Sequence, residues 1–216
     1  MRALRDCRLY GILDLGYVPA AEIHRVAAAM IDGGVDLIQL RAKGRELSAV
    51  ASLAADLHSA TSAGGIPLVI NDHAEIAREV GAEGVHVGQN DRSVAEVRAI
   101  AGENCFVGKS THTLEQAKRA LAEGADYLGW GPLFATPTKP DYAPIGLERI
   151  ATVHAAVPLP IFCIGGIKLA NLADVIAADA RRVVIVSGLL QAADIAKYAR
   201  AAKALLDQQS KISNQK

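Results

Sequence analysis

The feature that most constrains the fold of this chain is a repeated alternation of short apolar runs with longer segments of helical period. Eight such runs occur, at residues 9–13, 37–40, 68–70, 84–87, 105–108, 127–130, 161–164 and 183–186. Because each run is apolar at successive positions, it predicts a strand that is buried on both faces, as in a parallel sheet.

The segments between the runs are Ala-rich and carry apolar residues at helical spacing. They predict helices over residues 20–32, 47–63, 94–101, 113–123, 147–156, 169–178 and 191–208. Ser93 followed by Glu96 has the spacing of a capping box, and Thr113 is placed to cap the helix that follows it. Gly34 and Gly124 fall just past predicted helix ends, where a left-handed residue is favoured.

Strand–helix units repeating about every 27 residues predict an α/β protein with a single-domain (β/α)₈ TIM barrel. We expect the barrel to span residues 1–206 and the polar segment 207–216 to form a frayed tail. The rival fold is a doubly wound open sheet, which usually has fewer strands and a Gly-rich loop after the first one. The segment Leu13-Asp14-Leu15-Gly16 is not such a loop.

Charge and apolar content exclude several classes of partner. Lys and Arg number 23 and Asp and Glu also number 23, so no basic surface for nucleic acid is expected. No apolar run has the length of a membrane span, and the first residues lack the apolar segment of a secretory signal. Cys7, Cys105 and Cys163 are odd in number and widely spaced, which predicts free thiols and a reducing compartment, the cytoplasm.

Polar side chains with catalytic potential follow nearly every predicted strand. In a barrel of this type the active site lies at the carboxyl ends of the strands, so these residues should meet on one rim. The rim candidates after the second to eighth strands are Gln39, Arg41 and Lys43; Asn71 and Asp72; Asp91; Ser110 and His112; Thr136, Thr138 and Lys139; Gly165 and Gly166; and Ser187 and Gly188. This clustering predicts an enzyme.

Two carboxylates and three cations on this rim suit a metal-bound diphosphate. Asp72 and Asp91 follow adjacent strands and could share Mg²⁺ with phosphate oxygens, although either residue could instead cap the next helix. Arg41, Lys43 and Lys139 have no matching number of acids beyond that pair. Cations beside a divalent metal are suited to hold a diphosphate group.

A second anion site is predicted on the same rim. The loop after residues 127–130 is stiffened by prolines and carries Thr136, Thr138 and Lys139, which are suitable donors to an oxyanion. Gly165-Gly166 and Ser187-Gly188 follow the last two strands, where such barrels bind phosphate on backbone N–H groups.

Two histidines have open roles. His86 lies inside a predicted strand, which favours a buried and hydrogen-bonded side chain. His112 follows a strand end, where it could act as a general base or simply lead into the next helix.

Several motifs, taken together and in order, resemble the thiamine phosphate synthase family over residues 9–190. They are Gln39-Leu40-Arg41-Ala42-Lys43, Asn71-Asp72, Gly84-Val85-His86-Val87-Gly88-Gln89-Asn90-Asp91, Ser110-Thr111-His112-Thr113, Gly129-Trp130-Gly131-Pro132, Thr136-Pro137-Thr138-Lys139, Ile164-Gly165-Gly166-Ile167 and Val186-Ser187. The resemblance implies a (β/α)₈ transferase of thiamine biosynthesis that acts on two small molecules.

The implied reaction joins 4-amino-2-methyl-5-hydroxymethylpyrimidine diphosphate to a thiazole phosphate and releases pyrophosphate. By the same resemblance, the pyrimidine diphosphate is bound by Gln39, Arg41, Lys43, Asn71, Ser110 and Lys139, and the thiazole phosphate by Thr136, Pro137, Thr138, Gly166, Val186 and Ser187. Catalytic roles are implied for Arg41, Lys43, Lys139 and Ser110, and Mg²⁺ binding for Asp72 and Asp91.

The family reaction is dissociative: pyrophosphate leaves first, and the thiazole nitrogen captures a carbocation stabilised by the aminopyrimidine. Two positions depart from the family pattern, the residue before Asp14, where Thr is usual, and Lys109, where an apolar or small residue is common.

Two alternative functions stay open on the sequence. The first is the related thiazole tautomerase, which would use His112 as its acid–base residue. The second is a catalytically silent phosphate-binding barrel, which would be expected to have lost ligands. The oligomeric state also stays open, a homodimer included.

Overall fold

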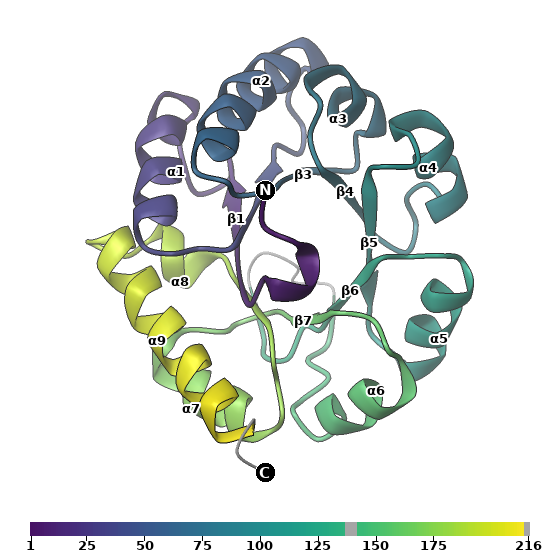
Figure 1. The fold of residues 1–216 in the computed structure, drawn as a ribbon, viewed down its shortest axis with the longest axis vertical. Coiled ribbons are helices and arrows are strands. Elements are labelled where there is room, and N and C mark those ends of the chain that lie inside the picture. The colour runs from purple at the N-terminus through teal and green to yellow at the C-terminus, as the bar shows by residue number, and fades with distance from the viewer. Residues whose placement is uncertain (137–141, 214–216) are drawn as a thin grey trace.

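The computed structural model describes residues 1–136 and 142–213, with side chains to residue 208, as a closed barrel of parallel strands (Figure 1). The strands are β1 Leu9–Asp14, β2 Leu37–Arg41, β3 Leu68–Asn71, β4 Gly84–Val87, β5 Phe106–Thr111, β6 Tyr127–Trp130, β7 Ile161–Cys163 and β8 Val183–Ile185. They pair in chain order, and β8 closes the ring against β1. The predicted (β/α)₈ barrel is confirmed, and the open sheet is wrong.

Helices form a ring around the barrel. They are α1 Ile23–Asp32, α2 Leu47–Ala63, α3 Ala74–Val80, α4 Val94–Ala101, α5 Leu114–Ala122, α6 Ile150–Ala156, α7 Leu169–Ala177, α8 Ser187–Leu190 and α9 Ile195–Ser213, with 3₁₀ turns η1 Leu4–Asp6 and η2 Ala20–Glu22. The sequence did not predict α3, α8 or η1. Since α9 continues to Ser213, residues 207–213 of the expected tail are helical, and residues 214–216 lie outside the described residues.

Helix ends follow the predicted local chemistry. Ser93 and Glu96 form the capping box of α4, and the Thr113 hydroxyl accepts a hydrogen bond from the backbone N–H of Gln116 at the start of α5. Gly34 and Gly124 have φ of 82° each, in the left-handed region that glycine tolerates. These signals mark the starts of α4 and α5 and the ends of α1 and α5.

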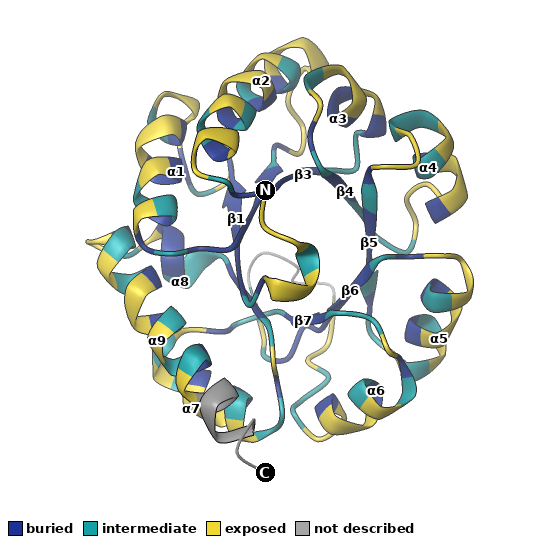
Figure 2. Cartoon of the chain, in the orientation of Figure 1, coloured by how far each residue is buried: buried dark blue, intermediate teal, exposed yellow. Residues whose placement is uncertain are grey.

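Two apolar layers build the molecule, and Figure 2 shows the buried strands inside a ring of helices whose outer faces are exposed. The larger layer packs the strands against the helices. The smaller one fills the barrel with side chains that include Tyr10, Tyr127 and Phe162. Gly108 makes room for the Tyr127 ring, because a Cβ on Gly108 would lie 2.0 Å from a carbon of Tyr127, and Gly84 makes room for the ring of Phe106 in the same way.

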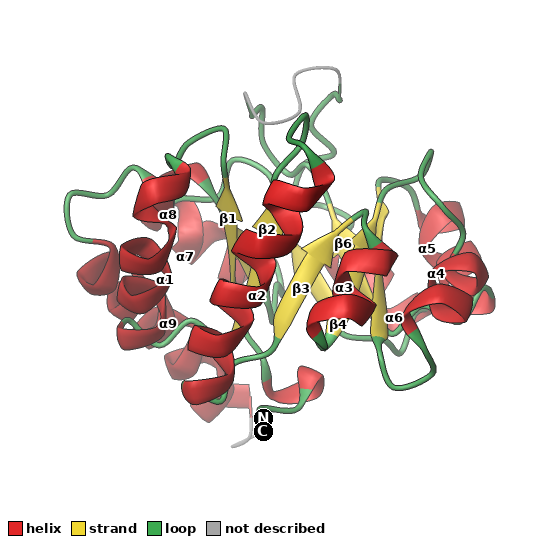
Figure 3. Ribbon diagram, turned by 90° about the horizontal axis from the view of Figure 1, so that it is seen from above, coloured by secondary structure: helices red, strands yellow, loops and turns green. Residues whose placement is uncertain are grey.

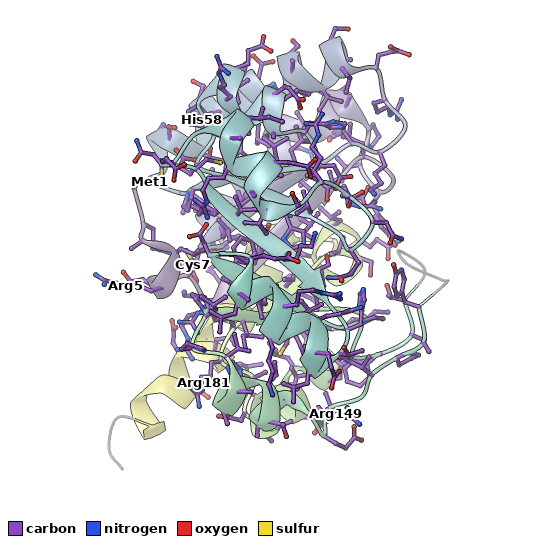
Figure 4. The ribbon with its side chains drawn as sticks, turned by 90° about the vertical axis from the view of Figure 1, so that its right-hand side faces the viewer. Met1, Arg5, Cys7, His58, Arg149 and Arg181 are labelled. Atoms are coloured by element: carbon purple, nitrogen blue, oxygen red, sulfur yellow. The ribbon has the colours of Figure 1, made fainter. Side chains whose placement is uncertain are left out.

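The two ends of the barrel differ. Figure 3 shows the N-terminus at one end of the barrel and the loops that follow the strands at the other. Figure 4 shows Met1, Arg5 and Cys7 at the end where the strands begin, so the N-terminal segment lies away from the loop end. The carboxyl-end rim is therefore free to form a site.

The cysteines are buried and reduced. Cys7, Cys105 and Cys163 are all free thiols, and burial raises the pKa of Cys105 to about 11 and that of Cys163 to about 12. Protonated thiols are poor nucleophiles, so burial does not activate Cys105 or Cys163 as a nucleophile. Across the described residues, no helix combines the length and apolar character needed to cross a bilayer.

Candidate active site

A cavity opens at the carboxyl ends of the strands. Its volume is about 940 Å³, counting the space open to solvent. Most of the residues predicted for the site line it, namely Gln39, Arg41, Lys43, Asn71, Asp72, Asp91, Ser110, Thr136, Gly166, Val186 and Ser187. Pro137, Thr138 and Lys139 lie outside the described residues.

Two cations of the rim, Arg41 and Lys43, are paired with acids. The guanidinium of Arg41 lies 2.5 Å from a carboxylate oxygen of Asp14, and the Lys43 ammonium lies 3.1 Å from a carboxylate oxygen of Asp72. The count of rim acids, which included none beyond Asp72 and Asp91, is therefore wrong. It overlooked Asp14, which is 3% exposed and also accepts a hydrogen bond from the backbone N–H of Gly16.

Asp14 is the site residue that the sequence analysis missed. It ends β1, just as Arg41 ends β2, and the two are register partners in the barrel. The rule that rim residues follow strand ends would have identified it if applied to the first strand. Its carboxylate fixes the orientation of Arg41, whose side chain is only 19% exposed.

Asp72 and Asp91 offer oxygen ligands to the same cavity. Asp72 has a left-handed backbone, with φ of 65°, and the carboxylate of Asp91 accepts a hydrogen bond of 2.7 Å from the Gly88 N–H. No cluster of three or more His, Cys, Asp or Glu within the described residues could hold a metal alone. Two carboxylates completed by substrate oxygens are a donor set that suits Mg²⁺.

A hydrogen-bonded chain forms the floor of the cavity. Gln39 donates to the hydroxyl of Tyr10 over 2.6 Å, and the hydroxyls of Tyr10 and Tyr127 lie 3.1 Å apart. His86 then joins Tyr127 at 3.0 Å and Ser110 at 2.9 Å through its two ring nitrogens. Burial raises the pKa of both tyrosines, so the phenols stay protonated.

His86 is hydrogen-bonded as predicted, but the prediction that it is buried is wrong: it is half-buried, because it lines the cavity. Its contact with Ser110 joins β4 to β5, a pairing that no local pattern in the sequence reveals. Because Ser110 is tied to His86 and Gln39 to Tyr10, the floor holds two predicted substrate-binding side chains in fixed positions.

His112 contributes to the wall of the cavity. A ring nitrogen is hydrogen-bonded to the carbonyl oxygen of Gly131, and the ring stacks on Tyr142 with centroids 4.5 Å apart. Its backbone N–H donates to the side-chain oxygen of Gln116 over 2.7 Å. These contacts position the imidazole between the loops after β5 and β6.

The other side of the cavity is built from glycines and the start of α8. Gly165 and Gly166 have φ of 97° and 68°, and a Cβ on Gly165 would lie 2.4 Å from Pro132. Only glycine fits this turn. Val186 and Ser187 begin the following helix, where free backbone N–H groups favour an anion.

Comparison with known proteins gives a consistent result. The family described as thiamine monophosphate synthase matches residues 9–189. The thiamine-phosphate synthase of Chloroflexus aurantiacus is 42% identical over 202 residues, covering 93% of each chain. That of Shouchella clausii is 38% identical over 208 residues, covering 96% of this chain and 100% of the relative.

A solved structure shares the whole architecture. The thiamine phosphate pyrophosphorylase of Pyrococcus furiosus superposes with a TM-score of 0.88 at 28% identity, covering 96% of this chain and 99% of that chain.

Proposed function

This chain belongs to the thiamine monophosphate synthase family and is a transferase that forms thiamine phosphate, and from that premise we propose how its rim binds two substrates. One is 4-amino-2-methyl-5-hydroxymethylpyrimidine diphosphate and the other is a thiazole phosphate. The observation that carries the proposal is that the rim side chains from different strands line one cavity with cations at one side and a glycine turn at the other.

The diphosphate half of the site is assigned to the side where β2, β3 and β5 end. Arg41 and Lys43 supply positive charge, with Lys139 from the loop after β6. Gln39, Asn71 and Ser110 supply neutral polar groups that suit the pyrimidine. The fixed positions of Gln39 and Ser110 in the floor chain support a role in orienting this ring.

The thiazole half is assigned to the opposite side. Its phosphate is proposed to bind the backbone of Gly166 and the start of α8 at Val186 and Ser187, supported by the donors available at this turn and helix end. Thr136, Pro137 and Thr138 of the loop after β6 are proposed to complete this half.

The proposed chemistry is dissociative. The bond between the pyrimidine methylene carbon and the diphosphate oxygen breaks first, and the thiazole nitrogen then forms its bond to the cationic carbon. Negative charge grows on the leaving diphosphate, so the charges of Arg41, Lys43 and Lys139 favour this step. By holding the two substrates in one cavity, the binding residues place the thiazole nitrogen next to the cationic methylene carbon of the pyrimidine.

We assign Asp72 and Asp91 to Mg²⁺, because two carboxylates with diphosphate oxygens form a suitable donor set. When bound, the metal would supply charge neutralisation to the diphosphate. Lys43 is paired with Asp72, which keeps an ammonium next to the proposed metal side of the cavity.

A product assay tests the whole proposal. Purified protein given both substrates and Mg²⁺ should form thiamine phosphate and pyrophosphate, and chelation of Mg²⁺ should stop the reaction. Isomerisation of the thiazole alone would instead support the tautomerase, and binding of both substrates without turnover would support a silent barrel.

Replacement of Lys139 by alanine should raise KM for the pyrimidine diphosphate and lower kcat. A lost charge-assisted contact to the leaving group implies a fall in kcat/KM of about tenfold to a hundredfold. Steady-state kinetics would measure this, with Lys118→Ala, an exposed lysine on α5, as the control. An unchanged kcat/KM would remove Lys139 from the site.

Replacement of Asp14 by asparagine should reduce kcat/KM by about tenfold to a hundredfold, because Arg41 would lose the carboxylate that orients it. Asn keeps the size of the side chain and removes only the charge. The matched control is Asp174→Asn, an exposed residue of α7 outside the cavity. If kcat/KM rose in the Asp14 variant, then the carboxylate would be a competitor for Arg41 and not its support.

A cytoplasmic location and a homodimer complete the proposal. The three free, buried cysteines are as expected in a reducing compartment. Sedimentation velocity of the purified protein would distinguish a dimer from a monomer.

A further inference from the structure

A second recess lies on the outer face of β5, on the other side of this strand from the active-site cavity. Its volume is about 720 Å³, counting the space open to solvent. Lys109 of β5 lines it, while the next residue, Ser110, lines the active site. Since successive residues of a strand point to opposite faces, the two cavities share β5 as a common wall.

Lys109 is an unusual residue for the outer face of a barrel strand. It is 5% exposed, and the one hydrogen bond that its ammonium donates within the described residues, to the carbonyl oxygen of Arg92, is 3.4 Å long. An ammonium carries three donors and is costly to bury without partners. The carboxylate of Glu96 interacts electrostatically with the Lys109 ammonium, but Glu96 is exposed. Its carboxylate accepts hydrogen bonds from the backbone N–H and the hydroxyl of Ser93.

Apart from Ala120, the other residues that line the recess are polar, and they include a second cation. Arg119 of α5 lines it, together with the amide side chains of Asn90 and Gln116. Glu123 is the one acid among the lining residues. Two cations and neutral amides form a donor set for a small doubly charged oxyanion, which an ammonium and a guanidinium bind well.

Two side chains of the recess also touch the active site. The Gln89 amide donates to the carbonyl oxygen of Ser110 over 2.6 Å, and the Gln116 oxygen accepts from the backbone N–H of His112 over 2.7 Å. Both glutamines line the recess, and both Ser110 and His112 line the active-site cavity. The contents of the recess can therefore act on the end of β5 through these two contacts.

We propose that the recess behind β5 is a second ligand site, for a small phosphate-type oxyanion held by Lys109 and Arg119, and that its occupancy is transmitted to Ser110 and His112 through Gln89 and Gln116. This site is separate from the diphosphate and thiazole halves of the proposed active site. It makes the enzyme responsive to a phosphate compound that is not one of its substrates.

The test uses inorganic phosphate and a local reporter. The side-chain amide of Asn90 lines the recess but not the active site, so its NMR signal reports phosphate in the recess alone. At matched ionic strength in chloride, the signal should shift with a saturable midpoint. Lys109→Met and Arg119→Gln should each raise that midpoint about tenfold or more, as expected for a lost charged hydrogen bond.

Three further variants sharpen the result. Lys118→Gln, on the same helix but outside the recess, should leave the midpoint unchanged. Glu123→Gln should lower the phosphate midpoint, because it removes a negative charge that repels the phosphate. Lys109→Arg keeps the positive charge, so its phosphate midpoint should stay close to that of the unaltered protein, unlike that of Lys109→Met. The site would be overturned if Lys109→Met and Arg119→Gln had the same phosphate midpoint as the unaltered protein. It would also be overturned if Lys118→Gln raised the midpoint as much as they do. Because Arg119 is exposed, its variant tests the site even if Lys109→Met folds poorly.

The transmission is tested on the backbone amide of His112. Its signal should shift with the same phosphate midpoint as Asn90 in the unaltered protein, and in Lys109→Met that midpoint should rise together with the midpoint at Asn90. Phosphate that enters the active site would produce a shift that persists in the variant. A His112 response unaffected by Lys109→Met would overturn the transmission, whatever the outcome of the product assay.

Discussion

Protein carrying Asp91→Ala is expected to lose Mg²⁺-dependent formation of thiamine phosphate by about a hundredfold or more while keeping its fold. The reason is that, within the described residues, the proposed metal side of the cavity offers two carboxylates, and a metal that is no longer held cannot supply the several kcal/mol of charge stabilisation expected of it. The fold should survive, because a rim carboxylate whose main contact is the Gly88 N–H in its own loop adds little to the core.

The measurement is kcat against Mg²⁺ concentration, together with Mg²⁺ binding by calorimetry in the presence of the diphosphate substrate. Asp91→Asn should retain part of the binding, because an amide oxygen is a weaker ligand than a carboxylate. Asp174→Ala, on the exposed face of α7, is the control and should behave as the unaltered protein. Full activity in the Asp91→Ala protein would show that the metal assignment is wrong.

The barrel could be predicted from the sequence because its strands are apolar on both sides. Every predicted run forms a strand, and β4 and β6 have the predicted bounds. The helices that were not predicted, α3 and α8, lack a clear helical period of apolar residues. Helix α3 is short and carries Glu75, Arg78 and Glu79 on its outer face, so only three of its residues are buried. Helix α8 has four residues, too few for a period to be seen.

The rim residues could be predicted because the carboxyl ends of all strands meet at one end of a barrel. The ion pairs and hydrogen bonds between these residues could not be predicted. That Arg41 and Asp14 end neighbouring strands follows from the order of the strands, yet their ion pair depends on both side chains pointing into the barrel. The floor chain is harder still, because His86 and Ser110 meet only through the register of β4 and β5. Composition and spacing carry no information on such a contact.

The largest effect on stability is expected at the opposite end of the barrel, at Asp36. This carboxylate is 0% exposed and precedes β2. It accepts hydrogen bonds from the backbone N–H groups of Arg8 and Leu9, at 2.8 and 2.9 Å, and forms ion pairs with Arg2 and Lys203. One side chain thus joins the N-terminal segment, the start of β1 and the last helix, α9.

Asp36→Asn should therefore destabilise the protein by about 3–5 kcal/mol, because it leaves the Lys203 charge without a buried partner and weakens the bonds to β1. For a chain of this size the thermal midpoint should fall by about 6–20 °C. Calorimetry would measure this, with Asp32→Asn as the matched control. The Asp32 carboxylate is 71% exposed and pairs with Arg200 at 2.8 Å, and such surface pairs contribute about 1 kcal/mol or less. If the two variants melted at the same temperature, the burial of Asp36 would not be what fixes α9 to the barrel. A large difference between them would show that a single desolvated carboxylate holds the first strand and the last helix together.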